Sequence, residues 1–351
     1  MSPETSASVL SSLSHRARRI LYAVVTEYIT TGEPVGSRRL ARRYGLNLSP
    51  ASIRNVLADL TDAGLLMQPH TSAGRIPTDR GFRLFVDALV QMREVTAADR
   101  AAIEQRIRSL SGPREVLRES GRLLASMTGA AAVVAPPRPD EEPIAHIHFV
   151  PLPGERVLAV VVTRSGAVQN RIVPGEGIES ADLERAHNLL RELLRRGARS
   201  LAELRDALAA DLDGMRELRA RARSVVDAAL AAQQGPPELL VEGQGVLFDR
   251  PEFSDPEKLR AFVRAFEEKE RLVGLLDRTM ASSGVQVLIG AEANVEGVSD
   301  ISIVTAPIRH GTRTAGRLAV VGPQRLDYGK VVPLVELTAS VVGETLGTRR
   351  G

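Results

Sequence analysis

The spacing of hydrophobic residues predicts three short helices and a hairpin within the first 80 residues. Apolar side chains recur at helical intervals over residues 15–30, 38–44 and 50–63. Ser37 is expected to cap the second helix. Ser49 followed by Pro50 is a strong helix start, because serine caps free backbone N–H groups and proline fits the first turn. Residues 65–68 and 75–77 flank a polar loop with a glycine, as in a short hairpin. This order of elements is typical of a winged helix-turn-helix.

The remaining pattern alternates between amphipathic helices and runs of β-forming residues. Helices are predicted at 79–92, 97–130, 181–196, 211–232, 256–276 and 331–346. Strands are predicted at 145–151, 156–163, 168–173, 239–241, 286–290, 301–306 and 316–322. Strands, then helices, then strands again is the order expected of an α+β domain that is interrupted by a helical insertion.

Composition excludes several classes of protein. The 351 residues are 43% hydrophobic and 25% charged, which is ordinary for a globular chain. The absence of cysteine excludes disulfides, thiolate metal ligands and cysteine nucleophiles, and it suits a reducing compartment. No apolar run reaches the about 18 residues of a membrane-spanning helix, and the first residues lack the apolar segment of a secretory signal. We therefore expect a cytoplasmic protein without a membrane segment.

Positive charge is concentrated in the amino-terminal part of the chain. The formal net charge is only +3, although 43 arginines and three lysines bring the isoelectric point to about 9.6. Residues 14–83 hold eleven arginines and five acidic residues, a net charge of +6, whereas residues 84–351 carry a net −2 and Glu4 accounts for the rest. Such a concentration is expected of a phosphate-binding module, and a solvated helical surface is the alternative.

The third predicted helix and its neighbours contain side chains suited to DNA binding. The candidates for DNA contacts lie at its amino-terminal end: Ser49, Ala51, Ser52, Arg54 and Asn55. The two serines can reach phosphates or bases, and the other three are candidates for base contacts. Arginine can donate two hydrogen bonds to guanine and asparagine can pair with adenine, each contact contributing about 1–3 kcal/mol of discrimination. Contacts to the DNA backbone are expected from about half of the arginines Arg38, Arg39, Arg42 and Arg43. The hairpin candidates are His70, Thr71, Ser72 and Arg75, and Arg75 is expected either to enter a minor groove or to contact a phosphate. The alternative for each is a cap, an internal pair or a solvated position.

Seven long motifs resemble a single family. The amino-terminal ones are PVGSRRLA at 34–41, LSPASIRN at 48–55 and QPHTSAGRIPT at 68–78. The carboxy-terminal ones are PEFSD at 251–255, LIGAE at 288–292, SIVTA at 302–306 and VGPQRLDY at 321–328. Together they span essentially the whole chain, which resembles HrcA, the family of bacterial heat-inducible transcription repressors.

The resemblance implies an α+β multidomain repressor. Its parts would be a winged helix-turn-helix over residues 1–93, a GAF-like α/β domain formed by 94–180 and 251–351, and a helical dimerisation domain inserted at 181–250. The resemblance also implies a homodimer that binds double-stranded DNA at an inverted-repeat operator of the CIRCE type, upstream of chaperonin and related heat-shock operons. It implies modulation by the GroEL chaperonin and no cofactor. The helices of the insertion are candidates to bury against a partner subunit or to pack within one chain.

Two other classes of function are alternatives. An enzyme is disfavoured because the six histidines form no HExxH pattern, and neither a dinucleotide fingerprint nor a nucleophile elbow is complete. We therefore assign no catalytic residue. His146 and His148 alternate along a strand, but no adjacent residue supplies the third ligand of a metal site. The second alternative is a regulator whose GAF-like domain binds a small molecule, for which the sequence contains no recognisable ligand motif. Catalytic turnover would identify the enzyme, and a thermal shift with a metabolite would identify the ligand-gated regulator.

Overall fold

In the computed structural model the chain divides into two compact units. Unit 1 consists of residues 1–136 and 238–347, and unit 2 consists of residues 137–237 with 348–351. The structure describes Val9, isolated positions between 257 and 279, and the following ranges: 13–89, 92–136, 143–164, 168–210, 220–231, 239–248, 284–293, 300–310 and 313–348. Three parts of the chain lie largely or wholly outside the described residues: the predicted helix at 256–276, residues 137–142, and residues 211–219 of the predicted helix at 211–232.

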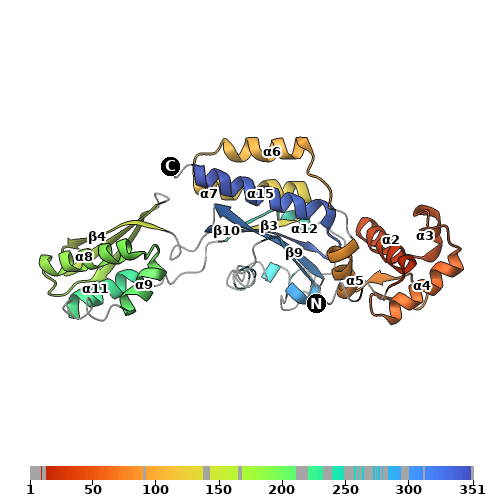
Figure 1. Cartoon of the computed structure of the whole chain (residues 1–351), viewed down its shortest axis with the longest axis horizontal. Coiled ribbons are helices and arrows are strands. Elements are labelled where there is room, and N and C mark those ends of the chain that lie inside the picture. Colours follow the sequence, from red (N-terminus) through yellow and green to blue (C-terminus); the bar gives the residue numbers. More distant parts are fainter. Residues whose placement is uncertain are drawn as a thin grey trace. The chain divides into compact units, whose positions relative to one another are not determined.

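The amino-terminal part of unit 1, residues 13–89, is called the head here (Figure 1). It contains helices α2 (His15–Thr31), α3 (Ser37–Arg43) and α4 (Pro50–Asp62), followed by strands β1 (Leu66–Met67) and β2 (Ile76–Pro77). The strands pair antiparallel, with Leu66 opposite Pro77 and Met67 opposite Ile76. α2 ends at Gly32, whose φ of 70° is in the left-handed region that favours glycine. The predicted three helices and hairpin are confirmed.

Some predicted helix boundaries were wrong. Ser37 lies inside α3, and Gly36 is the N-cap without any side-chain hydrogen bond. The helix predicted at 79–92 is α5 (Asp79–Leu84), which continues as a π-helical turn, η1 (Phe85–Leu89). The helix predicted at 97–130 is two helices, α6 (Ala97–Arg108) and α7 (Pro113–Thr128), because Gly112 and Pro113 start a new helix.

The rest of unit 1 contains a five-stranded antiparallel sheet, called the core sheet here, and several helices. The strand order of the core sheet is β7-β3-β10-β9-β8. The strands are β3 (Ala131–Ala135), β7 (Leu240–Glu242), β8 (Gln286–Ile289), β9 (Ile301–His310) and β10 (Arg313–Pro323). Helices α7 and α15 (Tyr328–Thr348) lie along one face (Figure 1). The short helix α12 (Gly245–Phe248) contributes Leu247 to a separate apolar cluster with the sheet. No helix among the described residues is long and apolar enough to cross a membrane.

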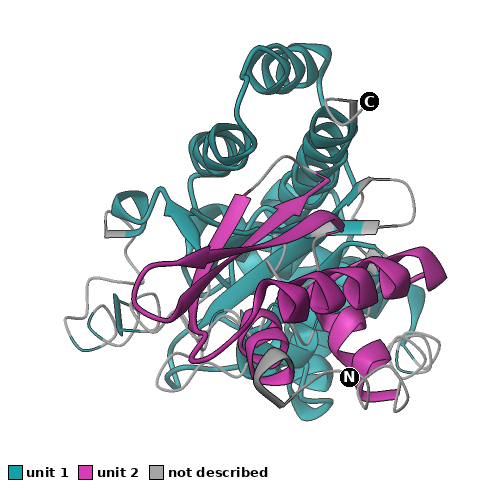
Figure 2. Cartoon of the chain, turned by 90° about the vertical axis from the view of Figure 1, so that its left-hand side faces the viewer, with its two compact units in different colours: residues 1–136, 238–347 teal, residues 137–237, 348–351 magenta. Residues whose placement is uncertain are grey.

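Unit 2 combines a three-stranded sheet with helices on one side (Figure 2). The strands, in the order β4-β5-β6, are β4 (Ile144–Leu152), β5 (Arg156–Thr163) and β6 (Val168–Pro174), and the helices are α8 (Ser180–Arg196), α9 (Leu201–Ala210) and α11 (Ala220–Leu230). Our prediction assigned residues 144–174 to the first part of the GAF-like domain. In the structure these strands share a core with α8, α9 and α11, because Ile147 and Val161 pack against their leucines.

The other face of this three-stranded sheet, called the outer face here, is rich in exposed apolar side chains. Register and alternation place three rows across it: Val150, Leu158 and Ile172; His148, Val160 and Asn170; His146, Val162 and Val168. Val150, Val168 and Ile172 are 44%, 58% and 60% exposed. The alternate residues of the central strand, Val157, Ala159 and Val161, are buried on the helix side.

Candidate nucleic-acid interface

α4 buries one face and exposes the other at its amino-terminal end. Its buried residues are Ile53, Leu57 and Leu60. Ser49 is the N-cap: its Oγ accepts a hydrogen bond from the Ser52 backbone N–H at 3.1 Å, and the two hydroxyl oxygens lie 3.0 Å apart. Ala51, Arg54 and Asn55 are exposed. Within the described part of the chain, the structure records no hydrogen bond or ion pair for the side chains of Arg54 and Asn55.

A buried carboxylate on α2 holds two of the four arginines of α3. Glu27 is fully buried, and its Oε1 lies 2.9 Å from Arg39 Nε and 2.9 Å from Arg43 Nη1. Its Oε2 accepts a hydrogen bond from the Tyr44 hydroxyl group at 2.8 Å. Arg39 also pairs with the exposed Glu33 at 3.0 Å. Sequence reasoning missed Glu27, although an acidic residue within the apolar stripe of α2 was a signal that it is buried with a partner.

The other two arginines of α3, Arg38 and Arg42, are exposed. In the described residues, neither has a recorded ion pair or side-chain hydrogen bond. The Tyr44 hydroxyl is a stable donor, because burial and the hydrogen bond to Glu27 both raise its pKa. The arginines predicted as one group therefore differ in their surroundings.

The hairpin exposes the three residues at its tip and anchors the fourth predicted residue. His70, Thr71 and Ser72 are exposed. Arg75 is half-buried, and its Nε donates a hydrogen bond to Thr61 Oγ1 of α4 at 2.9 Å. Gln68, which sequence reasoning did not single out, donates hydrogen bonds from its Nε2 to two loop carbonyls, those of Thr71 at 2.8 Å and Ala73 at 3.0 Å. Arg75 therefore connects the hairpin to α4.

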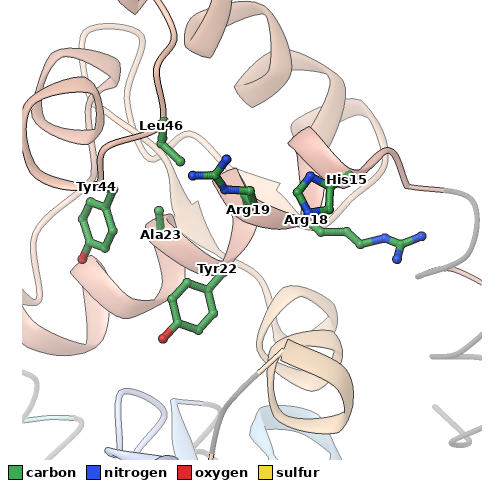
Figure 3. Close-up of a pocket in the computed structure, with 7 residues that line it drawn as sticks. All are labelled: His15, Arg18, Arg19, Tyr22, Ala23, Tyr44 and Leu46. Atoms are coloured by element: carbon green, nitrogen blue, oxygen red, sulfur yellow. The ribbon is translucent and has the colours of Figure 1, made fainter.

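Part of the positive charge of the head lies around a cavity of about 450 Å³ (Figure 3). It is lined by His15, Arg18, Arg19, Tyr22, Ala23, Tyr44 and Leu46. The Arg19 side chain extends toward Leu46, and its Nη2 lies 3.5 Å from the Gly45 carbonyl oxygen. These cations contribute to the net charge of residues 14–83, but no sequence motif assigned them to a site.

α5 connects the head to the core sheet through a polar cluster around Arg83. The Nε and Nη2 atoms of Arg83 both donate hydrogen bonds to the Glu292 carboxylate. Its Nη1 donates to Asp87 at 3.1 Å, and its Nη2 also donates to the Val287 carbonyl oxygen. Burial disfavours the charged guanidinium, but the hydrogen bonds and charges of Glu292 and Asp87 outweigh it and raise the pKa of Arg83. Nearby, Asp79 accepts hydrogen bonds from the backbone N–H of Ala291 at 3.0 Å and from Gln324 Nε2 at 2.8 Å.

The histidines considered for metal binding acquire a third neighbour in the fold. The ring of His187 on α8 stacks on His148 with centroids 5.3 Å apart, and its Nδ1 lies 2.9 Å from the Ile147 carbonyl oxygen. In the described part of the chain, no group of three histidine, aspartate or glutamate side chains is arranged to hold a metal ion.

Comparison with known proteins gives consistent matches over the whole chain. The family model of the HrcA protein C-terminal domain matches residues 114–332. A protein of Sorangium cellulosum named heat-inducible transcription repressor HrcA is 47% identical over 346 residues, 96% of this chain and 99% of that protein. A protein of the same name from Geobacter sulfurreducens is 40% identical over 343 residues, again 96% and 99% of the two chains.

One solved structure supports the fold. It is described as a crystal structure of a hypothetical protein at 2.2 Å resolution, and it is 22% identical with a TM-score of 0.61. The match covers 97% of this chain and 99% of that chain. The likeness therefore extends to the overall fold, and at this identity it says nothing about function.

Proposed function

Because the chain belongs to the HrcA family, we propose that it is a heat-inducible transcription repressor that binds an inverted-repeat DNA operator as a homodimer. The observation that carries the proposal is the amino-terminal end of α4. There, Arg54 and Asn55 are exposed and without internal partners among the described residues, while the opposite face of the helix is buried. A recognition helix needs this division, because its exposed end enters the major groove and its other face packs on the domain.

The head would act as a winged helix-turn-helix, with α4 as the recognition helix and the β1–β2 hairpin as the wing. Arg54 and Asn55 would contact base edges, with Ala51 beside a thymine methyl group and the Ser49 and Ser52 hydroxyls near the DNA backbone. Arg38 and Arg42 would contact phosphates from α3, and His70, Thr71 and Ser72 would do so from the wing. The hydrogen bond from Arg75 to Thr61 favours a structural role for that arginine over insertion into a groove.

The outer face of unit 2 supports the homodimer. An inverted repeat is read by two identical modules that are related by a two-fold axis, so a second copy of the chain would be the occupant of this exposed apolar surface. The outer face presents six aliphatic side chains on three neighbouring strands: Val150, Leu158, Val160, Val162, Val168 and Ile172. Contiguous exposed apolar side chains of this kind mark an interaction site, because covering them with another surface removes them from water.

The dimer is tested by a charge on the outer face. We expect Ile172→Glu to convert the dimer to a monomer at micromolar concentration, because the carboxylate would be desolvated in the interface. Light scattering coupled to size-exclusion chromatography measures the mass. Arg191→Glu, which places an acid on an exposed position of α8, is the matched control and keeps the wild-type mass. A dimeric Ile172→Glu variant would contradict this interface.

The remaining parts of the proposal concern regulation. The core sheet with its flanking helices would be the GAF-like domain, unit 2 would supply dimerisation, and the GroEL chaperonin would maintain the DNA-binding form. Repressors act on DNA without catalysing a reaction, so the protein would be a regulator and not an enzyme. Its place of action would be the cytoplasm.

Gel-shift titration tests the whole proposal. The full-length protein is titrated against an inverted-repeat operator of the CIRCE type and against a scrambled duplex of the same length, at several salt concentrations and with or without chaperonin. We expect at least about 1,000-fold preference for the operator and a steep fall in affinity with salt. Chaperonin is expected to raise the active fraction. Equal affinity for the two duplexes would contradict the repressor function.

A further inference from the structure

The four arginines of α3 form two parallel rows. Arg38 and Arg42 are four residues apart, and so are Arg39 and Arg43, so each pair lies along one side of the helix. All four side chains are exposed, Arg39 by 42% and Arg43 by 55%, but only the row of Arg39 and Arg43 pairs with the buried Glu27. The sequence does not distinguish the rows, because all four side chains are identical and adjacent.

The surroundings of Glu27 explain why its partners are fixed. A carboxylate that is withdrawn from water is stable only when opposite charges and hydrogen bonds replace its hydration. Both arginine partners come from one row of α3, and the third partner, Tyr44, is the C-cap of the same helix. All three thus attach α3 to α2. If either guanidinium moved to a phosphate, it would leave part of this buried charge without compensation.

We infer that Glu27 is a positioning residue, which keeps Arg39 and Arg43 for docking α3 on α2 and leaves Arg38 and Arg42 as the phosphate contacts of this helix. The inference rests on the proposed DNA-binding function, because it specifies which cations of that site meet the DNA. It also explains how a short helix with four arginines would bind DNA without giving every duplex the same high affinity. Phosphate contacts carry no sequence information, so withdrawing two of them favours discrimination.

Neighbouring substitutions in the two rows test the inference. Each phosphate contact contributes about 0.9 to the slope of log K against log salt concentration. We therefore expect Arg38→Gln and Arg42→Gln each to reduce the slope by about one, and Arg39→Gln and Arg43→Gln each to change it by less than about half of that. Arg38 is adjacent to Arg39, and Arg42 is adjacent to Arg43, so each substitution in one row has a neighbouring control in the other row. Equal reductions in both rows would overturn the inference.

Glu27→Gln provides the second test. The amide has nearly the same size and can still accept the Tyr44 hydrogen bond, but it no longer attracts the two guanidinium groups. We expect affinity for the scrambled duplex to rise several-fold, the salt slope to steepen by about one or more, and the operator preference to fall. A merely structural role predicts the opposite for the scrambled duplex, namely weaker binding to both DNAs. Glu33→Gln is the control, because Arg39 remains paired with Glu27 in that variant.

The outcomes separate this inference from the proposed function. If the wild-type protein fails to prefer the operator, the repressor proposal fails, but the salt slopes of the two rows are still measurable on any duplex. If the wild type prefers the operator and Glu27→Gln binds both DNAs more weakly, only the role of Glu27 is overturned. Circular dichroism establishes that each variant is folded. If Glu27→Gln does not fold, the comparison between the rows decides alone.

Discussion

Arg54 and Asn55 are exposed residues near the amino-terminal end of α4, and within the described part of the chain their side chains have no recorded partners. We expect Arg54→Ala to weaken operator binding by about 5- to 150-fold, which corresponds to about 1–3 kcal/mol for a lost bidentate base contact. The melting temperature should stay nearly unchanged, because an exposed substitution without internal contacts alters stability by less than about 0.5 kcal/mol. Titration against operator and scrambled duplexes measures the effect.

Arg54→Lys is the control for this substitution. Lysine keeps the positive charge but lacks the planar fork that donates two hydrogen bonds to one base. It should therefore keep the affinity for the scrambled duplex and lose most of the operator preference. If Arg54→Lys retained the full preference, Arg54 would be a phosphate contact instead.

Some interactions within a few positions were predictable, although the cap expected at Ser37 was wrong, and interactions with distant partners were not predictable. The capping role of Ser49 follows from the local pattern Ser-Pro before an apolar stripe, and the structure confirms it. The partners of Glu27, Arg75 and Arg83 lie on other elements, and Glu292 is more than 200 positions from Arg83. Periodicity gives the face on which a residue lies, but it contains no information about which distant side chain faces it.

Among the elements, those with a clear period or a strong cap were predicted and the others were missed. β4, β5 and β6 alternate or are bounded by turns, and they were found nearly residue by residue. β3 was missed because its sequence, AAVVA, is short and buried on almost every position, so it shows no alternation. The change from α-helix to π-helix at Phe85 leaves the helical spacing almost unchanged, so the sequence pattern did not reveal it.

The hairpin is held against the α2–α3 connection at a point where only glycine fits. Val35 and Arg75 exchange two backbone hydrogen bonds, at 2.9 and 3.0 Å. A Cβ atom on Gly74 would lie 2.5 Å from the carbonyl carbon and oxygen of Val35. We expect Gly74→Ala to push the hairpin away and to lower the free energy of unfolding by about 1–3 kcal/mol, as overpacking commonly does. Chemical denaturation measures the loss.

Operator binding should weaken in parallel, because the displaced hairpin carries the exposed residues His70 to Ser72. Gly36→Ala is the matched control, since a Cβ atom there meets nothing within 4 Å. Its effect on stability should be clearly smaller. Equal losses in the two variants would show that the close approach at Gly74 is unimportant.

On the scale of the whole molecule, the sequence indicated strands, helices and strands in the correct order but not how they are grouped. Residues 144–174 were expected beside the later strands, yet their sheet has its own core with α8, α9 and α11. Two stretches of β-forming residues look alike to a pattern analysis, whether they pair with each other or belong to different units. The grouping depends on long-range pairing, which is visible only in the registers of the strands.

We expect the cluster around Arg83 to determine whether the head and the core sheet unfold together. The side chains of Arg83 and Glu292 are 12% and 27% exposed, so removing one partner leaves a poorly hydrated charge behind. We expect Arg83→Ala to lower the free energy of unfolding by about 2–3 kcal/mol, somewhat less than the about 3–5 kcal/mol of a fully buried pair. This pair joins the head to the core sheet. In the wild type, calorimetry should therefore show one unfolding transition for the two parts together. In the variant, the head should unfold in a separate transition at a lower temperature.

Arg93→Ala is the comparison that identifies the cause. Arg93 also pairs with a residue of the later chain, Asp327, but the two side chains are 59% and 50% exposed. An exposed pair contributes about 0–1 kcal/mol, so this variant should melt like the wild type. If Arg83→Ala also melted in the wild-type manner, the head would be held by its apolar contacts alone, such as the packing of Phe82 against Tyr328 with ring centroids 6.4 Å apart. An early head transition in Arg83→Ala alone would mean that the buried ion pair transmits stability between the DNA-binding part and the sheet.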